Sequence, residues 1–224
     1  MHHATIEDRV EVLPGKVPDF FAALERAAPR LEALGVRCLG AFSTVGATGR
    51  WNEVFLYWEL ESFEHYARVL ASCDGPGSLS DLADPEWRLR AGGSSLTLHA
   101  TRPCPTLADL VAAGVRGRVF LHEYIRVLPG KRQEYVEHYI QNYLEATRKA
   151  GRELVGIWAL QKSANDVLIL LAIPDWATHA HALVHRPDAY AEKPWRKSAP
   201  LVRADYDLRM LVPGPRALNP LASS

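Results

Sequence analysis

The chain has 224 residues, and 48% of them are hydrophobic, which is enough to build one large core or two small ones. Lys plus Arg and Asp plus Glu both number 26, and no basic stripe with interleaved aromatic residues occurs, so a nucleic-acid partner is not expected. The first residues are charged, and no apolar run approaches the ~20 residues that cross a bilayer. We therefore expect a cytoplasmic protein with no membrane partner.

The cysteine and histidine spacings do not indicate a metal site. The three cysteines, Cys38, Cys73 and Cys104, are odd in number and lack CxxC spacing, which argues against both a disulfide framework and a cysteine zinc site. His181 and His185 have helical chelating spacing, but no third ligand is evident. The sequence predicts no metal.

An internal repeat organises the chain. The run Val12-Leu13-Pro14-Gly15-Lys16 recurs as Val127-Leu128-Pro129-Gly130-Lys131. Further landmarks then recur in the same order: Leu39-Gly40 with Val155-Gly156, Asn52-Glu53-Val54 with Asn165-Asp166-Val167, Pro85-Glu86-Trp87-Arg88 with Lys193-Pro194-Trp195-Arg196, and Pro103 with Pro213. The separations vary only between roughly 108 and 116 residues, which indicates a duplication.

Each copy reads β-α-β-β-α-β. Hydrophobic periodicity in the first copy predicts a strand at 6–12, a helix at 20–34, strands at 37–45 and 53–60, a helix ending at Leu70 and a strand at 96–102. Ser62 is the expected N-cap of the second helix. The Gly/Ser/Pro-rich stretch 72–93 is predicted to be a mobile flap.

The second copy repeats this pattern. It predicts strands at 119–128, 153–160, 166–173 and 206–212, with helices at 131–150 and 175–185. Asp175 is the expected N-cap of the second of these helices. We divide the chain into a first module at 1–103, a linker at 104–117 that contains either coil or one short helix, a second module at 118–213, and an unpacked tail at 214–224.

These landmarks, present in both copies, resemble the modules of the NIPSNAP family in the dimeric α+β-barrel superfamily. The resemblance implies a ferredoxin-like module with strand order 4-1-3-2, with helices on one face of the sheet and a second sheet against the other. A sheet with one bare face needs such a partner, and here the same chain supplies it. The expected fold is α+β, with tandem duplicated ferredoxin-like βαββαβ modules pairing into a barrel.

Strand alternation separates the face under the helices from the face inside the barrel. Val10 and Val12, with Ile125 and Val127, fit the helix-covered face. The opposite positions of the first strands, together with positions of the last strands aligned on the terminal prolines, predict a polar cluster inside the barrel: Glu7, Arg9, His99, His122, Tyr124, Asp207 and Arg209.

Such a cluster suits proton transfer, because burial and opposite charges bring pKa values toward neutrality. We assign His122 as the general acid/base, Tyr124 as a hydrogen-bond donor and Asp207 as the group that orients an imidazole, with Glu7 and His99 completing the catalytic set. The candidate substrate-binding residues are Arg9, Arg209, Trp87 and Trp195. The alternatives are solvated strand charges or cross-strand ion pairs, and tryptophans that pack helix against sheet.

Three functions fit these features. The first is an enzyme without a dedicated organic cofactor that acts on an apolar or aromatic small molecule, as a biosynthetic monooxygenase, isomerase, cyclase or lyase. The second, which the resemblance to the barrel superfamily implies, is a haem-dependent enzyme that uses His99 or His122, the two histidines placed on strands; no CxxCH attachment motif occurs. The third is a non-enzymatic ligand-binding or scaffold protein whose barrel is filled by side chains. The aromatic residues at 51–58 favour either a flat ligand or the interface of a homodimer.

Overall fold

Eight antiparallel strands close into a barrel in the order β1-β3-β2-β8-β5-β7-β6-β4, as seen in a computed structural model of the chain. The structure describes residues 3–46, 52–72, 79, 88–102, 104–184 and 199–223. Strands β1 to β4 lie in the order 4-1-3-2, and β5 to β8 repeat that order as 8-5-7-6. The expected fold of two ferredoxin-like modules that pair into an α+β barrel is confirmed.

The elements of both copies follow the predicted β-α-β-β-α-β order. The first copy contains β1 (Ala4–Val12), α1 (Val17–Ala33), β2 (Arg37–Thr44), β3 (Glu53–Leu60), α2 (Phe63–Ala71) and β4 (Arg90–Ala100). After α3 (Leu107–Ala112), the second contains β5 (Val119–Val127), α4 (Arg132–His138), the π-helical turn η3 (Tyr139–Tyr143), α5 (Leu144–Lys149), β6 (Glu153–Leu160), β7 (Asp166–Ile173), α6 (Trp176–Val184) and β8 (Arg203–Pro213), followed by the short helix η4 (Arg216–Leu218).

The predicted helix caps are present. The Ser62 hydroxyl accepts a hydrogen bond from His65 N, and the Asp175 carboxylate accepts one from Thr178 N at 2.6 Å. Thr106 and Asp109 form a reciprocal capping box at the start of α3, which is why part of the linker is helical rather than coil. The flap predicted at 72–93 lies largely outside the described residues, although its last residues begin β4.

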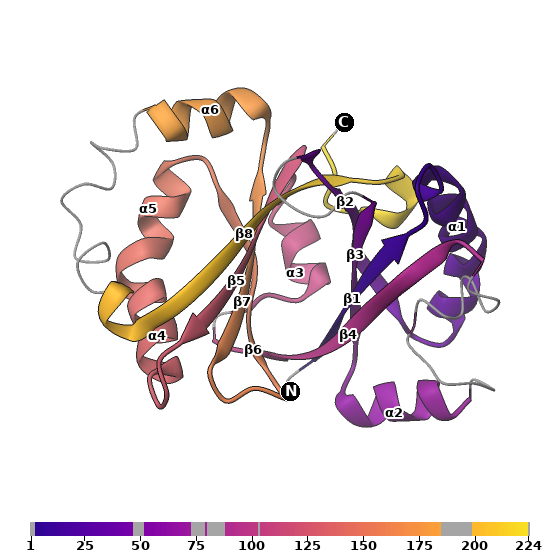
Figure 1. Cartoon of the computed structure of the whole chain (residues 1–224), viewed down its shortest axis with the longest axis horizontal. Coiled ribbons are helices and arrows are strands. Elements are labelled where there is room, and N and C mark those ends of the chain that lie inside the picture. The colour runs from indigo at the N-terminus through magenta and orange to yellow at the C-terminus, as the bar shows by residue number, and fades with distance from the viewer. Residues whose placement is uncertain are drawn as a thin grey trace.

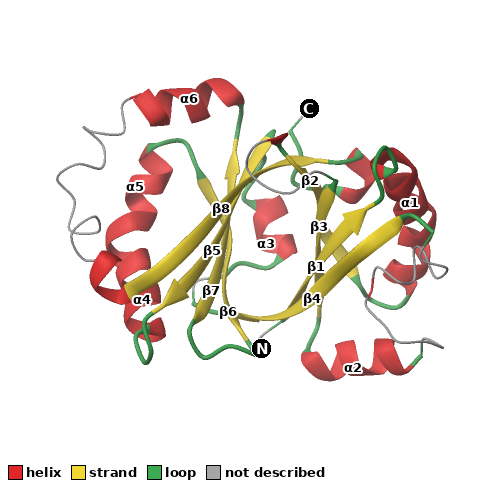
Figure 2. Cartoon of the chain, in the orientation of Figure 1, coloured by secondary structure: helices red, strands yellow, loops and turns green. Residues whose placement is uncertain are grey.

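The helices of the two modules cover opposite outer sides of the barrel, as Figures 1 and 2 show. Beneath them lie two separate apolar cores. Val10 and Val12 pack in the core under α1, and Ile125 and Val127 pack in the core of the second module. Alternation along the first strand of each copy therefore identified the helix-covered face correctly.

The barrel closes at two seams where one module meets the other, β2 with β8 and β4 with β6. Its interior is a third apolar cluster, filled by large side chains that include Phe42, Phe55, Tyr57, Phe120 and Trp158. The linker helix α3 and the C-terminal segment cover one end of the barrel with buried side chains, Leu110 and Leu221. The prediction of an unpacked tail is wrong, because its leucines supply apolar surface that the barrel end buries.

Two glycines of the repeated landmarks make room for interior aromatic rings. A Cβ at Gly156 would lie 2.0 Å from the ring of Trp158, and a Cβ at Gly40 would lie 2.3 Å from the ring of Phe42. In each copy, the side chain two residues after the glycine folds back across the strand, next to a register shift. This close approach gives a physical reason for glycine at both landmarks.

We expect Gly156→Ala to lower the free energy of unfolding by about 1–3 kcal/mol, because the fully buried Trp158 ring must move in a packed interior. Urea unfolding followed by circular dichroism measures the loss. Gly92→Ala is the matched control, since a Cβ there first meets the flexible Glu11 side chain at 3.5 Å. Equal effects of the two substitutions would contradict the role assigned to Gly156.

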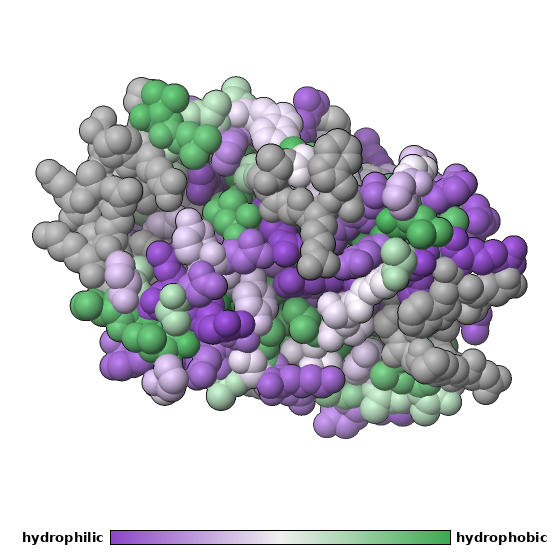
Figure 3. Space-filling model, in the orientation of Figure 1, coloured by the Kyte–Doolittle hydropathy of each residue, from purple (hydrophilic) through white to green (hydrophobic). Residues whose placement is uncertain are grey.

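The outer surface is mixed. On the face shown in Figure 3, strongly hydrophilic residues lie between small separate groups of hydrophobic residues. Within the described parts of the chain, no helix is both long and apolar enough to cross a membrane.

Candidate acid–base site in the barrel

Glu7 and His122 occupy equivalent positions of the repeat and meet inside the barrel. Each stands five residues before the repeated Val-Leu-Pro-Gly-Lys run, on β1 and β5 respectively. Both side chains are completely buried, and His122 Nε2 lies 2.9 Å from Glu7 Oε2. The duplication therefore brings a carboxylate of one module against an imidazole of the other.

The Glu7 carboxylate receives three hydrogen bonds. Tyr57 OH donates to Oε2 at 2.5 Å, Arg9 Nε donates to Oε1 at 2.6 Å, and His122 Nε2 is the third partner. Burial on its own raises the pKa of Glu7, but the charges of His122 and Arg9 and the hydrogen bonds from His122 and Tyr57 outweigh it and lower the pKa from 4.5 to about 2. An ionised carboxylate only accepts hydrogen bonds, so His122 Nε2 carries the proton and donates.

The second ring nitrogen of His122 is unused. Its Nδ1 is buried and has no hydrogen-bond partner among the residues that the structure describes. The ring lies against Phe55, with 4.8 Å between the ring centroids. Leaving a buried polar atom unpaired costs about 1–3 kcal/mol, so this nitrogen is available to a proton or to a small polar molecule.

The free energy of unfolding should fall at acidic pH because Glu7 becomes protonated. Its pKa is lower in the folded chain than its ordinary 4.5, so its stabilising contribution is complete above pH 4.5 and is lost as the pH falls toward 2. The shift corresponds to about 3 kcal/mol. We expect urea unfolding between neutral pH and pH ~3 to show falling stability, with a shallower fall in Glu7→Gln. An identical acid slope in the two proteins would contradict the pKa assigned to Glu7.

The polar end of the barrel lies beyond this pair, at the end away from α3. The guanidinium of Arg9 lies over the rings of Phe55 and Tyr124, at 5.3 and 5.4 Å. Tyr124 OH donates to Asp166 Oδ2 at 2.6 Å. Burial, followed by this hydrogen bond and the charge of Asp166, raises the pKa of Tyr124 to about 12. Tyr124 is therefore a neutral donor at physiological pH.

Arg209 completes this end from β8. It hydrogen-bonds to Glu53 on β3 and to Asp207 on its own strand, and its guanidinium lies 5.5 Å from the centre of the Phe55 ring. Asp207 is half exposed and contacts Arg209 rather than an imidazole. The geometry therefore does not support the predicted orienting role of Asp207, and Glu7 occupies that place beside His122.

His99 does not join the cluster. It pairs with Ala4 in the sheet, and it lies on the outside of the barrel, where its ring meets Phe63 of α2 edge-on at 5.1 Å. Alignment of the last strands on their prolines matched His99 with Arg209, whereas the sheet register makes Leu96 the counterpart, since Leu96 pairs with Glu7 as Arg209 pairs with His122. A slip of three residues, an odd number, reverses the faces of a strand.

Other residues of the site escaped the sequence prediction. Tyr57 stood out only as part of an aromatic hairpin, and Glu53 and Asp166 only as landmarks of the repeat. Strand alternation was a usable signal for all three, because Glu53 and Tyr57 share a face with Phe55, and Asp166 shares one with the interior Leu168. The predicted substrate-binding residues Trp87 and Trp195 lie outside the described residues.

Two pockets in the described part of the chain lie outside the barrel. One, of about 400 Å³, adjoins α1 and the C-terminal segment, and the other, of about 800 Å³, adjoins His99 and α4. The cluster itself is enclosed by packed rings. In the part of the chain that is described, no group of three or more His, Cys, Asp or Glu side chains is placed to hold a metal ion.

The surroundings of His122 do not fit a haem ligand. Its Nε2 is engaged by Glu7, and the fully buried ring is flanked by Phe55 and Tyr57. A planar macrocycle would have to displace these interior side chains. The other predicted haem ligand, His99, borders the larger of the two outer pockets.

No protein-family model and no curated protein matches the sequence. Solved NIPSNAP-domain proteins are similar over under half of the chain: one from Burkholderia xenovorans is 22% identical, with 43% of this chain and 94% of that chain covered and a TM-score of 0.35. This partial similarity carries no assignment of family.

Similarity over nearly the whole chain is found with three other solved structures. A monooxygenase-like protein from Fusobacterium nucleatum has a TM-score of 0.65 at 13% identity, covering 95% of this chain and 92% of that one. A second monooxygenase-like protein, from Lactobacillus acidophilus, has a TM-score of 0.64 at 12% identity, covering 95% of this chain and 94% of that one. A chlorite dismutase from Candidatus Nitrospira defluvii has a TM-score of 0.58 at 11% identity, covering 96% of this chain and 93% of that one. The chain shares the α+β-barrel fold of these proteins.

Proposed function

We propose that the protein is an enzyme that moves a proton to or from a small apolar or aromatic substrate at His122, without a dedicated organic cofactor. The observation that carries this proposal is the completely buried Glu7–His122 pair, in which Nε2 is held by the carboxylate and Nδ1 has no partner in the described chain. A carboxylate that holds one imidazole nitrogen leaves the other nitrogen oriented as a base. Monooxygenase-like neighbours in fold are consistent with an enzyme.

The groups around Phe55 suggest how a substrate would be held. Arg9 Nη2 is also buried without a hydrogen-bond partner among the described residues, and both Arg9 and His122 lie against the Phe55 ring. A substrate lying on this ring would give its proton to His122 Nδ1, and Arg9 Nη2 would stabilise the negative charge that develops. Tyr57 would keep Glu7 ionised, since burial and the neighbouring carboxylate raise the pKa of Tyr57 well above 10.

Further unpaired atoms support a polar occupant of the interior. Thr5 Oγ1 and Trp158 Nε1 are buried without hydrogen-bond partners in the described structure. Each such atom costs about 1–3 kcal/mol unless a bound molecule satisfies it. The interior also contains large rings, which restricts the substrate to a small molecule.

The packing of the same interior favours a second candidate, a non-enzymatic scaffold. Arg9 is paired with Glu7, Arg209 with Glu53, and Tyr124 with Asp166. Paired charges around a filled barrel are what a structural role predicts. The unpaired Nδ1 of His122 favours the first candidate, because a purely structural imidazole gains from using both of its nitrogens.

Isotope exchange detects proton transfer whatever the final product of the reaction is. Small aromatic and aliphatic carbonyl compounds and phenols are incubated with the protein in deuterium oxide, and loss of each C–H signal is followed by proton NMR while an oxygen electrode monitors oxygen use. We expect catalysed exchange or oxygen use with at least one compound and its loss in His122→Gln. Equal activity in His122→Gln would refute the assigned base, and inactivity of the wild type toward the whole panel would favour the scaffold.

A further inference from the structure

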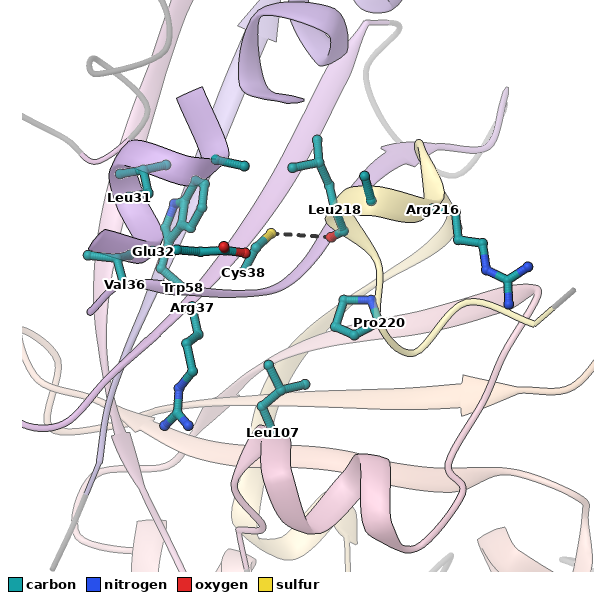
Figure 4. A pocket seen from close by; sticks show the side chains of 12 residues that line it. Leu31, Glu32, Val36, Arg37, Cys38, Trp58, Leu107, Arg216, Leu218 and Pro220 are labelled. Carbon is teal, nitrogen blue, oxygen red and sulfur yellow. Dashed lines mark hydrogen bonds between the residues drawn. The ribbon is translucent and has the colours of Figure 1, made fainter. Parts of the chain in front are cut away.

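A pocket of about 400 Å³ lies outside the barrel, among the end of α1, the start of β2, the helix α3 and the C-terminal segment (Figure 4). Its volume is in the range of small-molecule sites. The walls are largely apolar and come from segments far apart in the sequence: Leu31, Val36, Trp58, Leu107, Leu218 and Pro220.

The C-terminal wall is tied to β2. Cys38 Sγ donates to Leu218 O at 3.2 Å, a contact drawn in Figure 4, and Asn219 Oδ1 accepts a hydrogen bond from Ala41 N at 2.9 Å. Both Leu218 and Asn219 are buried. This wall is therefore part of the folded protein, although it belongs to the last residues of the chain.

The opposite walls are held by buried acids. Glu59, which is fully buried, accepts a hydrogen bond from Leu107 N at 2.8 Å and forms an ion pair of 2.7 Å with Arg37. Trp58 Nε1 donates to Asp8 at 3.0 Å, which fixes the indole that forms part of the wall. Three walls fixed by separate contacts make the pocket preformed, as ligand sites generally are.

The rim has one acid, Glu32, and two arginines, and Glu32 lies away from Arg216, so an acidic group is favoured at the side where Arg216 lies. Arg37 is already paired with Glu59, whereas Arg216 is exposed and has no ion-pair partner among the residues that the structure describes. Figure 4 places Arg37 and Arg216 at two sides of the pocket and Glu32 beside Cys38. Burial raises the pKa of the Cys38 thiol to about 12, so this side chain adds no negative charge. Arg216 thus lines an apolar chamber with an exposed side chain that is unpaired within the described chain and free to turn toward it.

We propose that this pocket binds a small, flat apolar molecule that carries one acidic group, with its apolar body against Trp58 and Leu218 and its anionic group at Arg216. A guanidinium is well suited to a carboxylate, which it can bind through two parallel hydrogen bonds. The site is separate from the Glu7–His122 pair, so it does not depend on the function proposed for the barrel.

Naphthoate and naphthamide are suitable probes, because they share the flat body and differ in the charge of the head group. Binding to the full chain is measured by calorimetry, and the Trp58 indole N–H is followed by NMR. We expect naphthoate to bind more tightly than naphthamide and to shift the Trp58 signal. Arg216→Gln should weaken naphthoate about fivefold and leave naphthamide unchanged. Arg26→Gln, an exposed arginine on α1 that does not line the pocket, is the matched control.

A blocking variant tests the location. Ala217 lines the pocket and is exposed, so Ala217→Trp fills the chamber without changing a core position and should weaken naphthoate at least about tenfold. Val111→Trp places the same side chain at an exposed position of α3 outside the pocket and should have no effect. Failure of either probe to bind at millimolar concentration, equal affinity for the two probes, or unchanged affinity in Ala217→Trp would each overturn the proposal.

Discussion

Replacing Glu7 with alanine should lower the free energy of unfolding by about 3–5 kcal/mol, which is among the largest effects expected of any single substitution in this chain. The reason is that the guanidinium charge of Arg9 stays in the barrel without the carboxylate that pairs with it. Arg9 and His122 lose their shared carboxylate inside the barrel, and the Tyr57 hydroxyl loses its acceptor. Urea unfolding near neutral pH measures the change.

The surface ion pair of Glu134 with Lys131 provides the control. Its nitrogen and oxygen lie 2.6 Å apart, but both side chains are nearly half exposed, so Glu134→Ala should change stability by less than about 1 kcal/mol. A double-mutant cycle of Glu7→Ala with His122→Gln should give a coupling energy of about 0.5–3 kcal/mol. A loss below about 1 kcal/mol for Glu7→Ala would mean that water, rather than protein, solvates this carboxylate.

Replacing His122 with glutamine should slow the reaction identified by isotope exchange by about 10²–10⁴-fold, the usual contribution of a positioned general base. Glutamine keeps a donor for Glu7 and approximates the length of the imidazole, but it offers no basic nitrogen in place of Nδ1. The rate constant should therefore fall while the chain stays folded, as circular dichroism and the unfolding midpoint would show.

The exposed His181 on α6 provides the matched control, because it lies outside the barrel and His181→Gln should leave the rate unchanged. Glu7→Gln should also slow the reaction, since it removes the carboxylate that orients the imidazole. A variant His122→Gln that retains the wild-type rate would exclude proton transfer at this residue and would leave the Glu7–His122 pair with a structural role.

The sequence predicted the barrel well because the duplication repeats the same β-α-β-β-α-β pattern, so each copy supports the assignment made in the other. Val10 and Val12 in one copy and Ile125 and Val127 in the other define the same helix-covered face, so the opposite face, with Glu7 and His122, follows directly. The contact between these two residues was not predictable, because it depends on how far the two sheets approach one another. Tertiary packing, rather than local pattern, sets that distance.

The last strands were harder to interpret for a physical reason. The register of β4 against β1 is fixed by hydrogen bonds across the sheet, including an irregularity between Glu11 and Val12. In that register Leu96, and not His99, is equivalent to Arg209. His99 was therefore assigned to the wrong face. For a polar residue in a strand of alternating pattern, the sequence does not show which face of the sheet the side chain lies on unless the pairing with a neighbouring strand is known.

The C-terminal segment shows the opposite difficulty. Its prolines and serines are typical of a solvated tail, yet Leu218 and Leu221 are buried and Asn219 bonds to β2. Composition describes the average behaviour of a segment, whereas two well-placed leucines over an open barrel end are enough to fix it. The outer pocket follows from that packing and had no signal in the sequence.

The most direct test of proton transfer at His122 is the protonation of its ring in the folded protein, measured by ¹⁵N NMR of labelled histidine near neutral pH. We expect a proton on Nε2, bonded to the ionised Glu7. A neutral ring whose single proton lies on Nδ1 would contradict the assigned base, because the lone pair would then face Glu7 and Nδ1 could not accept a proton from a substrate.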